Sequence, residues 1–303
     1  MNRLKSTTTD ALLASLYIFL HIAFFSTGTV LVKAVSISVG IAQLIFARSL
    51  ATLVPVLITR TARQAVMASM RTDVRNVLAL RAITGFLGIY GVYYTVANLP
   101  VSVALTITGI TPIFVIFLER LILKQAIRPE IYAYAVLAAI GIYLTAKNSP
   151  LTPSPNVISM PNIAIGLISG VLVAVSFVSV RHAAQKVGTS AIMFWFGLGK
   201  LAGATLLGGA TLLTTSYSLR DASCIAAICL LGAASDFSKT SAYRLSPAWI
   251  VSLLSLLAIP TSGIMANILF GERLSPTQLA GIGLMLVALS IAMCRRNQFQ
   301  DPR

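Results

Sequence analysis

Ten stretches of mostly apolar residues, most of them about 20 residues long, follow one another along this chain. A helix rises about 1.5 Å per residue, so a stretch of this length crosses a hydrocarbon core roughly 30 Å thick. The chain is 57% hydrophobic and only 10% charged, which leaves too little charge to cover a soluble domain of this size. The sequence therefore predicts an all-α integral membrane protein with ten transmembrane helices. The expected spans cover residues 11–32, 38–59, 76–97, 101–122, 130–146, 162–180, 190–213, 222–243, 247–269 and 276–294.

The two halves of the chain resemble each other in the placement of their prolines and charges. Pro112 and Pro260, each within a predicted span, lie 148 positions apart, and the same offset relates Lys33 to Arg181. Such matches at a fixed offset indicate a duplication. An odd number of spans per half places the second half in the opposite orientation, so we expect two inverted five-helix repeats. The expected units are a first repeat at 1–148, a linker at 149–161 and a second repeat at 162–303 with a short C-terminal tail.

The positive charges support this topology. The net charge of +15 could indicate nucleic-acid binding, but its distribution favours a membrane protein and argues against that partner. With a cytoplasmic amino terminus, 16 of the 23 Lys and Arg residues fall in cytoplasmic segments and four in segments on the other side. This asymmetry follows the positive-inside rule, so both termini are predicted to be cytoplasmic.

Two groups of motifs resemble a known module. In the first half, Leu80-Arg81-Ala82 leads through Tyr93-Tyr94 to Asn98-Leu99-Pro100, followed by a span with a central proline and a polar turn. In the second half, Ala242-Tyr243-Arg244-Leu245-Ser246-Pro247-Ala248 is followed by Phe270-Gly271-Glu272-Arg273-Leu274-Ser275. Both resemble the EamA module of the drug/metabolite transporter superfamily, over nearly the whole chain as two modules. The resemblance implies ten helices in inverted repeats, a central cavity, and transport of small organic molecules across the inner membrane, with the linker in the periplasm.

One turn departs from the pattern of the module. Lys124-Gln125 stands where the module usually has Gly-Glu, so the acidic residue of that turn remains only in the second half, as Glu272. A gating role for the first-half turn is therefore not supported by the resemblance.

Charged residues in the middle of a span are costly and usually face a cavity or a partner. Arg48 and Lys200 lie about midway along equivalent spans of the two halves, and a cationic pair facing one cavity would attract a carboxylate or phosphate. The alternative is that each side chain bonds helix carbonyls or extends along its stem to the interface. Arg81 and Glu119 lie nearer the cytoplasmic ends of their spans, and we expect both to extend to that interface.

Two further polar residues could bind substrate or a proton. Asp236 lies in the cytoplasmic half of its span and shares a helical face with Lys239. It could take up a proton or bind a substrate amine, or it could form a local ion pair with Lys239. His21 lies midway along the first span, where it could relay protons or pack as a hydrogen-bonded residue, and its unperturbed pKa lies near neutrality.

Prolines and aromatic residues complete the candidate site. Pro112 and Pro260 each remove a helical hydrogen bond, so the spans that hold them are expected to bend and to form paired walls of the cavity. Tyr90 and Trp195 are candidates for the cavity wall, although packing is the alternative for Trp195. The glycines 85, 88 and 91 recur every third residue, which indicates close helix packing.

These features predict a secondary carrier that works by alternating access. The chain contains no nucleotide-hydrolysing motif, and no metal, cofactor or enzymatic activity is predicted. We expect proton-coupled export of an amino-acid-like metabolite, zwitterionic or anionic, with the lipid bilayer as the other partner and a monomer or homodimer as the functional unit. The alternatives are an importer of a compound such as S-adenosylmethionine, a nucleotide-linked compound or a vitamin, and then a channel or a membrane enzyme.

Overall fold

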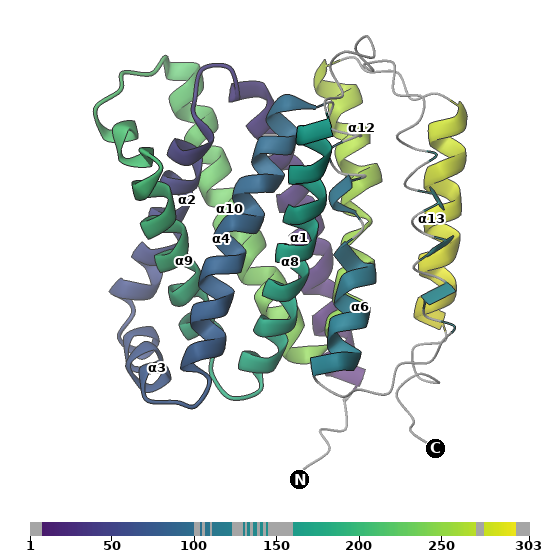
Figure 1. Ribbon diagram of the computed structural model, residues 1–303, viewed down its shortest axis with the longest axis horizontal. Helices are drawn as coiled ribbons and strands as arrows, with labels where there is room; N and C mark the ends of the chain where they lie inside the picture. The colour runs from purple at the N-terminus through teal and green to yellow at the C-terminus, as the bar shows by residue number, and fades with distance from the viewer. Residues whose placement is uncertain are drawn as a thin grey trace.

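The computed structural model describes residues 8–99, 111–122, 160–270 and 276–294, together with isolated positions between 104 and 144. These residues form a bundle of helices (Figure 1). The first half contributes α1 (Thr8–Val35), α2 (Ile41–Ile58), α3 (Arg60–Met70), α4 (Arg75–Asn98) and α6 (Thr111–Ile122). The second half contributes α8 (Met160–Ala184), α9 (Thr189–Leu206), the 3-10 helix η1 (Gly209–Leu213), α10 (Leu219–Leu245), α11 (Ala248–Ser255), α12 (Ala258–Phe270) and α13 (Pro276–Cys294).

The protein is an all-helical membrane protein. Six of the described helical stretches are long and apolar enough to cross a bilayer: Leu12–Val35, Ile41–Ile58, Arg75–Asn98, Pro161–Ala184, Leu219–Leu245 and Ala248–Leu269. The count of ten helices stays a prediction, because most of the span at 130–146 and the first part of the span at 101–122 lie outside the described residues. The turns with Lys124-Gln125 and Glu272 lie outside them too, as does the linker up to residue 159.

The basic segment 60–75, which lies between two predicted spans, is not a plain loop, because most of it forms α3. Ala62, Val66 and Ser69 lie on its buried face, at the spacing of successive helical turns, while Arg60 and Arg63 are exposed. The buried face packs against α2 and α9. A search for long apolar runs cannot detect such a helix, because its apolar residues are few and periodic.

The predicted ninth span contains a helix break beside Pro260. The helix α11 ends at Ser255 and α12 begins at Ala258, with a turn at Leu256 and Leu257 between them. Pro260 has no N–H to donate to the carbonyl of Leu256, and that carbonyl accepts from the N–H of Ile259 instead, at 2.9 Å. In the first half, α6 likewise begins at Thr111, directly before Pro112.

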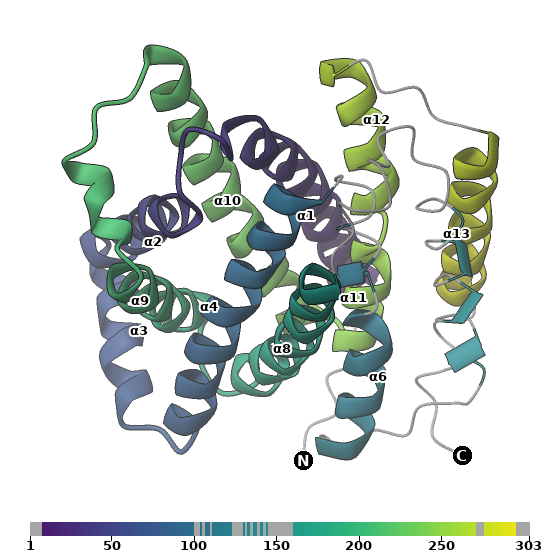
Figure 2. The ribbon, with the colours of Figure 1, turned by 45° about the horizontal axis from the view of Figure 1, so that its top comes forward.

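The helices pack in matched pairs drawn from opposite halves. The helix α1 packs along α10, and α4 packs along α8, while α2 faces α9 (Figures 1 and 2). The contact of α1 with α12 is matched by the contact of α8 with α6. Figure 1 also shows α1 beginning and α13 ending at the same end of the bundle, whereas α8 begins at the opposite end.

Lys33 and Arg181, which the 148-residue offset relates, make the same kind of contact. The Lys33 ammonium on α1 donates to the carbonyls of Ala97 and Leu99 at the end of α4, at 3.0 and 3.1 Å. Arg181 Nη1 on α8 donates to the carbonyls of Tyr243 and Arg244 at the end of α10, at 2.7 and 3.1 Å. Each cation therefore satisfies carbonyls at a helix carboxyl end, where the helix dipole favours positive charge.

Small residues allow α4 and α8 to approach closely, as the glycine spacing predicted. A Cβ atom on Gly88 would come within 2.7 Å of Val173 Cγ2, and one on Gly91 within 2.6 Å of Ser169 Cβ. Both distances are too short for carbon atoms, so the packing requires glycine at these positions.

Candidate functional site

A cavity of about 150 Å³ lies inside the helix bundle. Its wall includes residues of both helix-break regions, at Thr108 to Pro112 and at Ser252 to Ile259. The ionisable side chains of the wall are His21, Arg48, Arg81, Asp236, Lys239 and Tyr243. The volume lies below the roughly 300–1,000 Å³ of pockets that enclose drug-sized ligands, so in this shape the cavity suits a small metabolite.

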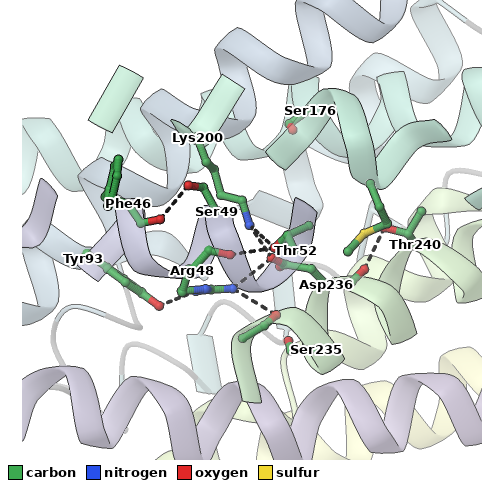
Figure 3. Close-up of polar contacts among 12 residues, drawn as sticks. Phe46, Arg48, Ser49, Thr52, Tyr93, Ser176, Lys200, Ser235, Asp236 and Thr240 are labelled. Atoms are coloured by element: carbon green, nitrogen blue, oxygen red, sulfur yellow. Dashed lines mark hydrogen bonds and ion pairs between the residues drawn. The ribbon is translucent and has the colours of Figure 1, made fainter. Parts of the chain in front are cut away.

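Arg48 lies on α2 with its side chain buried, and its guanidinium reaches α10. Nη2 donates to Asp236 Oδ2 at 3.0 Å and to the carbonyl of Gly232 at 3.1 Å, while Nη1 donates to the Tyr93 hydroxyl (Figure 3). A Cβ atom on Gly232 would collide with the guanidinium, so glycine is what lets Arg48 lie against the backbone of α10. The arginine is therefore fixed between α4 and α10.

Lys200 lies on α9 and is fully buried, with an exposed fraction of 0%. Its ammonium donates to Asp236 Oδ2 at 3.0 Å and to Thr52 Oγ1 at 2.9 Å. The two cations that the sequence pairs thus meet on one carboxylate oxygen (Figure 3). Contrary to the prediction, Lys200 is not among the residues of the cavity wall, because it lies behind Asp236 against α2.

Asp236 links three helices. Its side chain is 18% exposed and contributes to the cavity wall, and its Oδ2 atom holds Arg48 of α2 and Lys200 of α9. The local ion pair with Lys239, which the sequence left open, is not what the structure records among the described residues. The Lys239 ammonium instead lies 3.9 Å from the centre of the Phe177 ring.

His21 has a specific partner beside this cluster. Its Nδ1 atom lies 2.8 Å from the hydroxyl of Ser235, the residue before Asp236, and its ring packs 5.5 Å from that of Phe25. Which of the two groups donates depends on the histidine tautomer. The ring also lines the cavity, so both interpretations from the sequence, packing and proton relay, remain compatible with its position.

Arg81 does not extend to the interface as expected. The side chain is 6% exposed, lines the cavity, and donates from Nη1 to the hydroxyl of Ser176 on α8. Its guanidinium carbon lies 3.8 Å from the centre of the Phe196 ring. Position along a span suggested an interfacial residue, but no local sequence pattern indicates the α8 and α9 partners that hold Arg81 inside.

Glu119 is the second correction of this kind. It is 0% exposed, and its two carboxylate oxygens accept the backbone N–H groups of Ala248 at 3.0 Å and Trp249 at 2.8 Å. These are the first two residues of α11. The carboxylate therefore caps the amino end of a helix, where unpaired N–H groups and the helix dipole favour negative charge.

Tyr90 and Trp195, the two aromatic candidates, are not among the described residues of the cavity wall, and for Trp195 packing was the alternative. Tyr90 packs with its ring 6.0 Å from that of Phe86, one helical turn earlier on α4. Trp195 Nε1 donates to the hydroxyl of Ser69 on α3, at 3.2 Å. Trp195 thus serves packing between α9 and the helix α3 that the sequence analysis did not detect.

Besides Arg81, two ionisable cavity residues were not selected as candidates from the sequence: Tyr243, and Lys239 as a separate cation. Both follow Asp236 on α10 at helical spacing, which places positions 236, 239, 240 and 243 on one face. This shared face could have indicated from the sequence that Lys239 and Tyr243 lie beside Asp236.

Comparison with known proteins gives a consistent result. Residues 12–147 match the EamA-like transporter family. The pseudopaline exporter CntI of Pseudomonas aeruginosa strain UCBPP-PA14 is 27% identical over 302 residues, which cover 98% of this chain and 99% of that protein. An uncharacterized transporter of Helicobacter pylori strain J99 is 24% identical over 221 residues, covering 70% of this chain and 71% of that one. One solved crystal structure shares the fold, with a TM-score of 0.73 over 95% of this chain and 99% of that chain, at 17% sequence identity.

Proposed function

Because residues 12–147 match the EamA-like transporter family, we propose that this chain is a secondary carrier that exports a small amino-acid-like metabolite, anionic or zwitterionic, across the inner membrane. The observation that carries this proposal is the charge of the central cavity. Arg48, Arg81 and Lys239 line it, and Asp236 is the one acidic residue in its described wall. Charged side chains within a membrane are energetically costly and usually mark a functional site. An excess of cations suits a substrate with negative charge.

Alternating access is the proposed mechanism, with residues 1–148 and 162–303 as inverted repeats. The matched helix contacts and the matched caps by Lys33 and Arg181 support the repeats. The helix breaks support a site between them, since transporters often bind substrate where discontinuous helices meet near the midplane. The proposed orientation places both termini in the cytoplasm. A reporter fused to the carboxyl end that is active only in the periplasm would contradict it.

Export and small-metabolite specificity draw support from the relative that is an exporter of pseudopaline. The charge of the cavity also favours some of the alternative substrates over others. A cationic compound such as S-adenosylmethionine suits this cavity poorly, whereas a nucleotide-linked anion would suit its charge. Import of such an anion is therefore the second candidate.

Proton coupling is proposed to involve His21 and Asp236. Asp236 holds two cations on one oxygen, and both favour its charged form, so protonation becomes more favourable when one of those contacts opens. A substrate anion that replaces Asp236 at Arg48 would open it, which would link substrate binding to proton binding. Equal flux in proteoliposomes with and without a pH gradient would exclude this coupling.

Metabolite profiling tests the proposed function directly. Cells that lack the protein should retain a metabolite that overproducing cells release, and purified protein in proteoliposomes should show saturable counterflow of that compound. Arg48→Gln should reduce counterflow without loss of membrane insertion. The control Arg60→Gln removes the same charge from an exposed position on α3 and should leave counterflow intact. Electrical conductance without saturation would indicate a channel instead.

A further inference from the structure

We propose that Arg81, Lys239 and Tyr243 form an oxyanion subsite of the cavity, distinct from the cluster of Arg48, Lys200 and Asp236. The subsite holds a carboxylate or phosphate group of the transported metabolite, and the inference rests on the proposed function. All three residues line the cavity and carry hydrogen-bond donors; Arg81 and Tyr243 are buried and Lys239 is half-buried.

Two of these residues have buried polar atoms that lack a hydrogen-bond partner among the described residues. These atoms are Arg81 Nε and the Tyr243 hydroxyl. Buried polar groups are nearly always paired in folded proteins, because an unpaired one loses its bonds to water without replacement. Both residues line the cavity, so these buried donors point to a ligand that accepts their hydrogen bonds when the two side chains turn toward it.

The cations of the subsite also lack an acidic partner within the described part of the chain. Arg48 and Lys200 share Asp236, but the ion pairs recorded there include neither Arg81 nor Lys239. Arg81 lies against the Phe196 ring and Lys239 against the Phe177 ring. An aromatic face attracts and orients a cation but carries no net charge to neutralise it. The subsite therefore has two positive charges available to a bound anion.

Adjacent residues of α8 bring the three donors together. Ser176 accepts from Arg81, which reaches it from α4. Phe177 contacts the Lys239 ammonium, and its ring centre lies 5.3 Å from that of Tyr243, which is one turn further along α10. The pair of Ser176 and Phe177 thus positions donors from two helices on one side of the cavity.

Gly85 provides the space for Arg81. A Cβ atom at this position, one turn along α4, would collide with the Arg81 guanidinium and would come within 2.8 Å of the Phe196 ring. The glycine lets the guanidinium lie between α4 and Phe196, at the wall of the cavity. A planar guanidinium, an ammonium and a phenol together suit an oxyanion, which accepts several charge-assisted hydrogen bonds at once.

Thermal stabilisation by fractions of a cell extract tests the subsite without a known substrate. The probe is the small-molecule extract of the producing cells, separated on an anion-exchange resin into a retained anionic fraction and an unretained fraction. The resin is loaded at alkaline pH, where amino groups are neutral and a zwitterionic metabolite is retained as an anion. The purified full-length protein should be stabilised by the anionic fraction only. Methyl esterification of that fraction should abolish the effect for a carboxylate, and phosphatase treatment should abolish it for a phosphate.

Variants assign the effect to the subsite. Arg81→Gln and Lys239→Gln should each raise the amount of fraction needed for half-maximal stabilisation by about 10- to 100-fold, and Tyr243→Phe by about 2- to 10-fold. Arg60→Gln should respond like the wild type. The unliganded melting temperature of each variant reports its folding, and Tyr243→Phe removes only a hydroxyl, which keeps the test valid if Arg81→Gln does not fold.

Three results would overturn the subsite: stabilisation by the unretained fraction alone, stabilisation that survives both treatments, or wild-type behaviour of Lys239→Gln and Tyr243→Phe. If counterflow by the wild type stands while these variants behave normally, the subsite is wrong and the carrier assignment remains. If no fraction stabilises the wild type and profiling finds no exported metabolite, the proposed function itself fails.

Discussion

Replacing Asp236 with asparagine tests the central charge cluster most directly. The substitution keeps the size of the side chain but removes the one carboxylate that holds Arg48 and Lys200, each at 3.0 Å. Both cations are buried, so each would lose its counter-ion without gaining water. Breaking a buried ion pair on one side typically costs about 3–5 kcal/mol. For a chain of this length, at roughly 2 °C per kcal/mol, the melting temperature should fall by about 6–10 °C.

A double variant distinguishes electrostatics from simple loss of packing. In Asp236→Asn, the two cations also repel each other, and adding Lys200→Met removes one of them while keeping an apolar side chain of similar length. The double variant should therefore melt at a higher temperature than Asp236→Asn alone. Lys200→Met by itself leaves the pair of Arg48 and Asp236 and should cost less than about 1.5 kcal/mol. The measurement is thermal unfolding of purified protein in one lipid nanodisc preparation.

Asp221→Asn serves as the matched control, because it is the same substitution in the first turn of the same helix. It should lower stability by at most about 1 kcal/mol, the usual contribution of an acidic residue near a helix amino end. The electrostatic account is refuted if Asp236→Asn melts like the wild type, or if the double variant is no more stable than Asp236→Asn.

Three further predictions concern other contacts. Glu119→Gln should lower stability by about 2–3 kcal/mol, because the amide NH2 replaces one of two charged acceptors of backbone N–H groups, and calorimetry would measure it. Gly232→Ala should cost about 1–3 kcal/mol and impair counterflow, because its Cβ displaces the Arg48 guanidinium. The hydrogen bond from Lys186 lowers the pKa of Asp73, so any stabilisation by this pair is present above the usual carboxyl pKa and is lost as the pH falls through the lowered value. Both groups are exposed, so Asp73→Asn should leave the melting temperature at pH 7 unchanged.

A control variant or a contradicting result is available for each of these three predictions. A Cβ atom on Gly283 of α13 would meet no atom of the described residues within 4 Å. Gly283→Ala should therefore be neutral or stabilising, as expected for glycine replaced by alanine within a helix. A loss in Gly283→Ala equal to that in Gly232→Ala would mean that the collision with Arg48 is irrelevant. An unchanged melting temperature in Glu119→Gln would exclude the helix cap as a source of stability, and a fall in Asp73→Asn at pH 7 would show that the exposed pair matters.

The sequence predicted most of the long apolar helices that the structure describes, and it located several charges within them. Apolar runs located the membrane-spanning helices because burial in lipid requires continuous apolar surface, and the proline at 260 marked a helix break because proline lacks an N–H group. Arg48 and Asp236 could be recognised as deep residues by the same logic. The position of a residue along its span can be read from a single sequence.

The partners of these residues could not be predicted, because they depend on how helices pack against each other. Arg48 and Asp236 are 188 positions apart, and no local pattern relates them. Arg81 and Glu119 illustrate the same limit: their positions near span ends suggested contact with the interface, but position along a span does not say whether a side chain faces lipid or protein. Amphipathic α3 was missed because its apolar residues form a stripe and not a run.

The buried charges fall into two groups. One group binds backbone groups at helix ends, and the other binds side chains with which a substrate could compete. Glu119 and Arg181 bind backbone groups at the ends of α11 and α10, and these contacts lie at helix termini, where a substrate in the cavity does not compete for them. Asp236 instead binds two side chains beside the cavity, and a substrate carboxylate offers Arg48 the same chemistry that Asp236 does. A carrier needs contacts that persist while its halves move and contacts that change with substrate. The helix caps have the chemistry of the first kind, and the ion pairs of Asp236 have that of the second, which is why Asp236 rather than Glu119 is the residue whose replacement should alter both stability and transport.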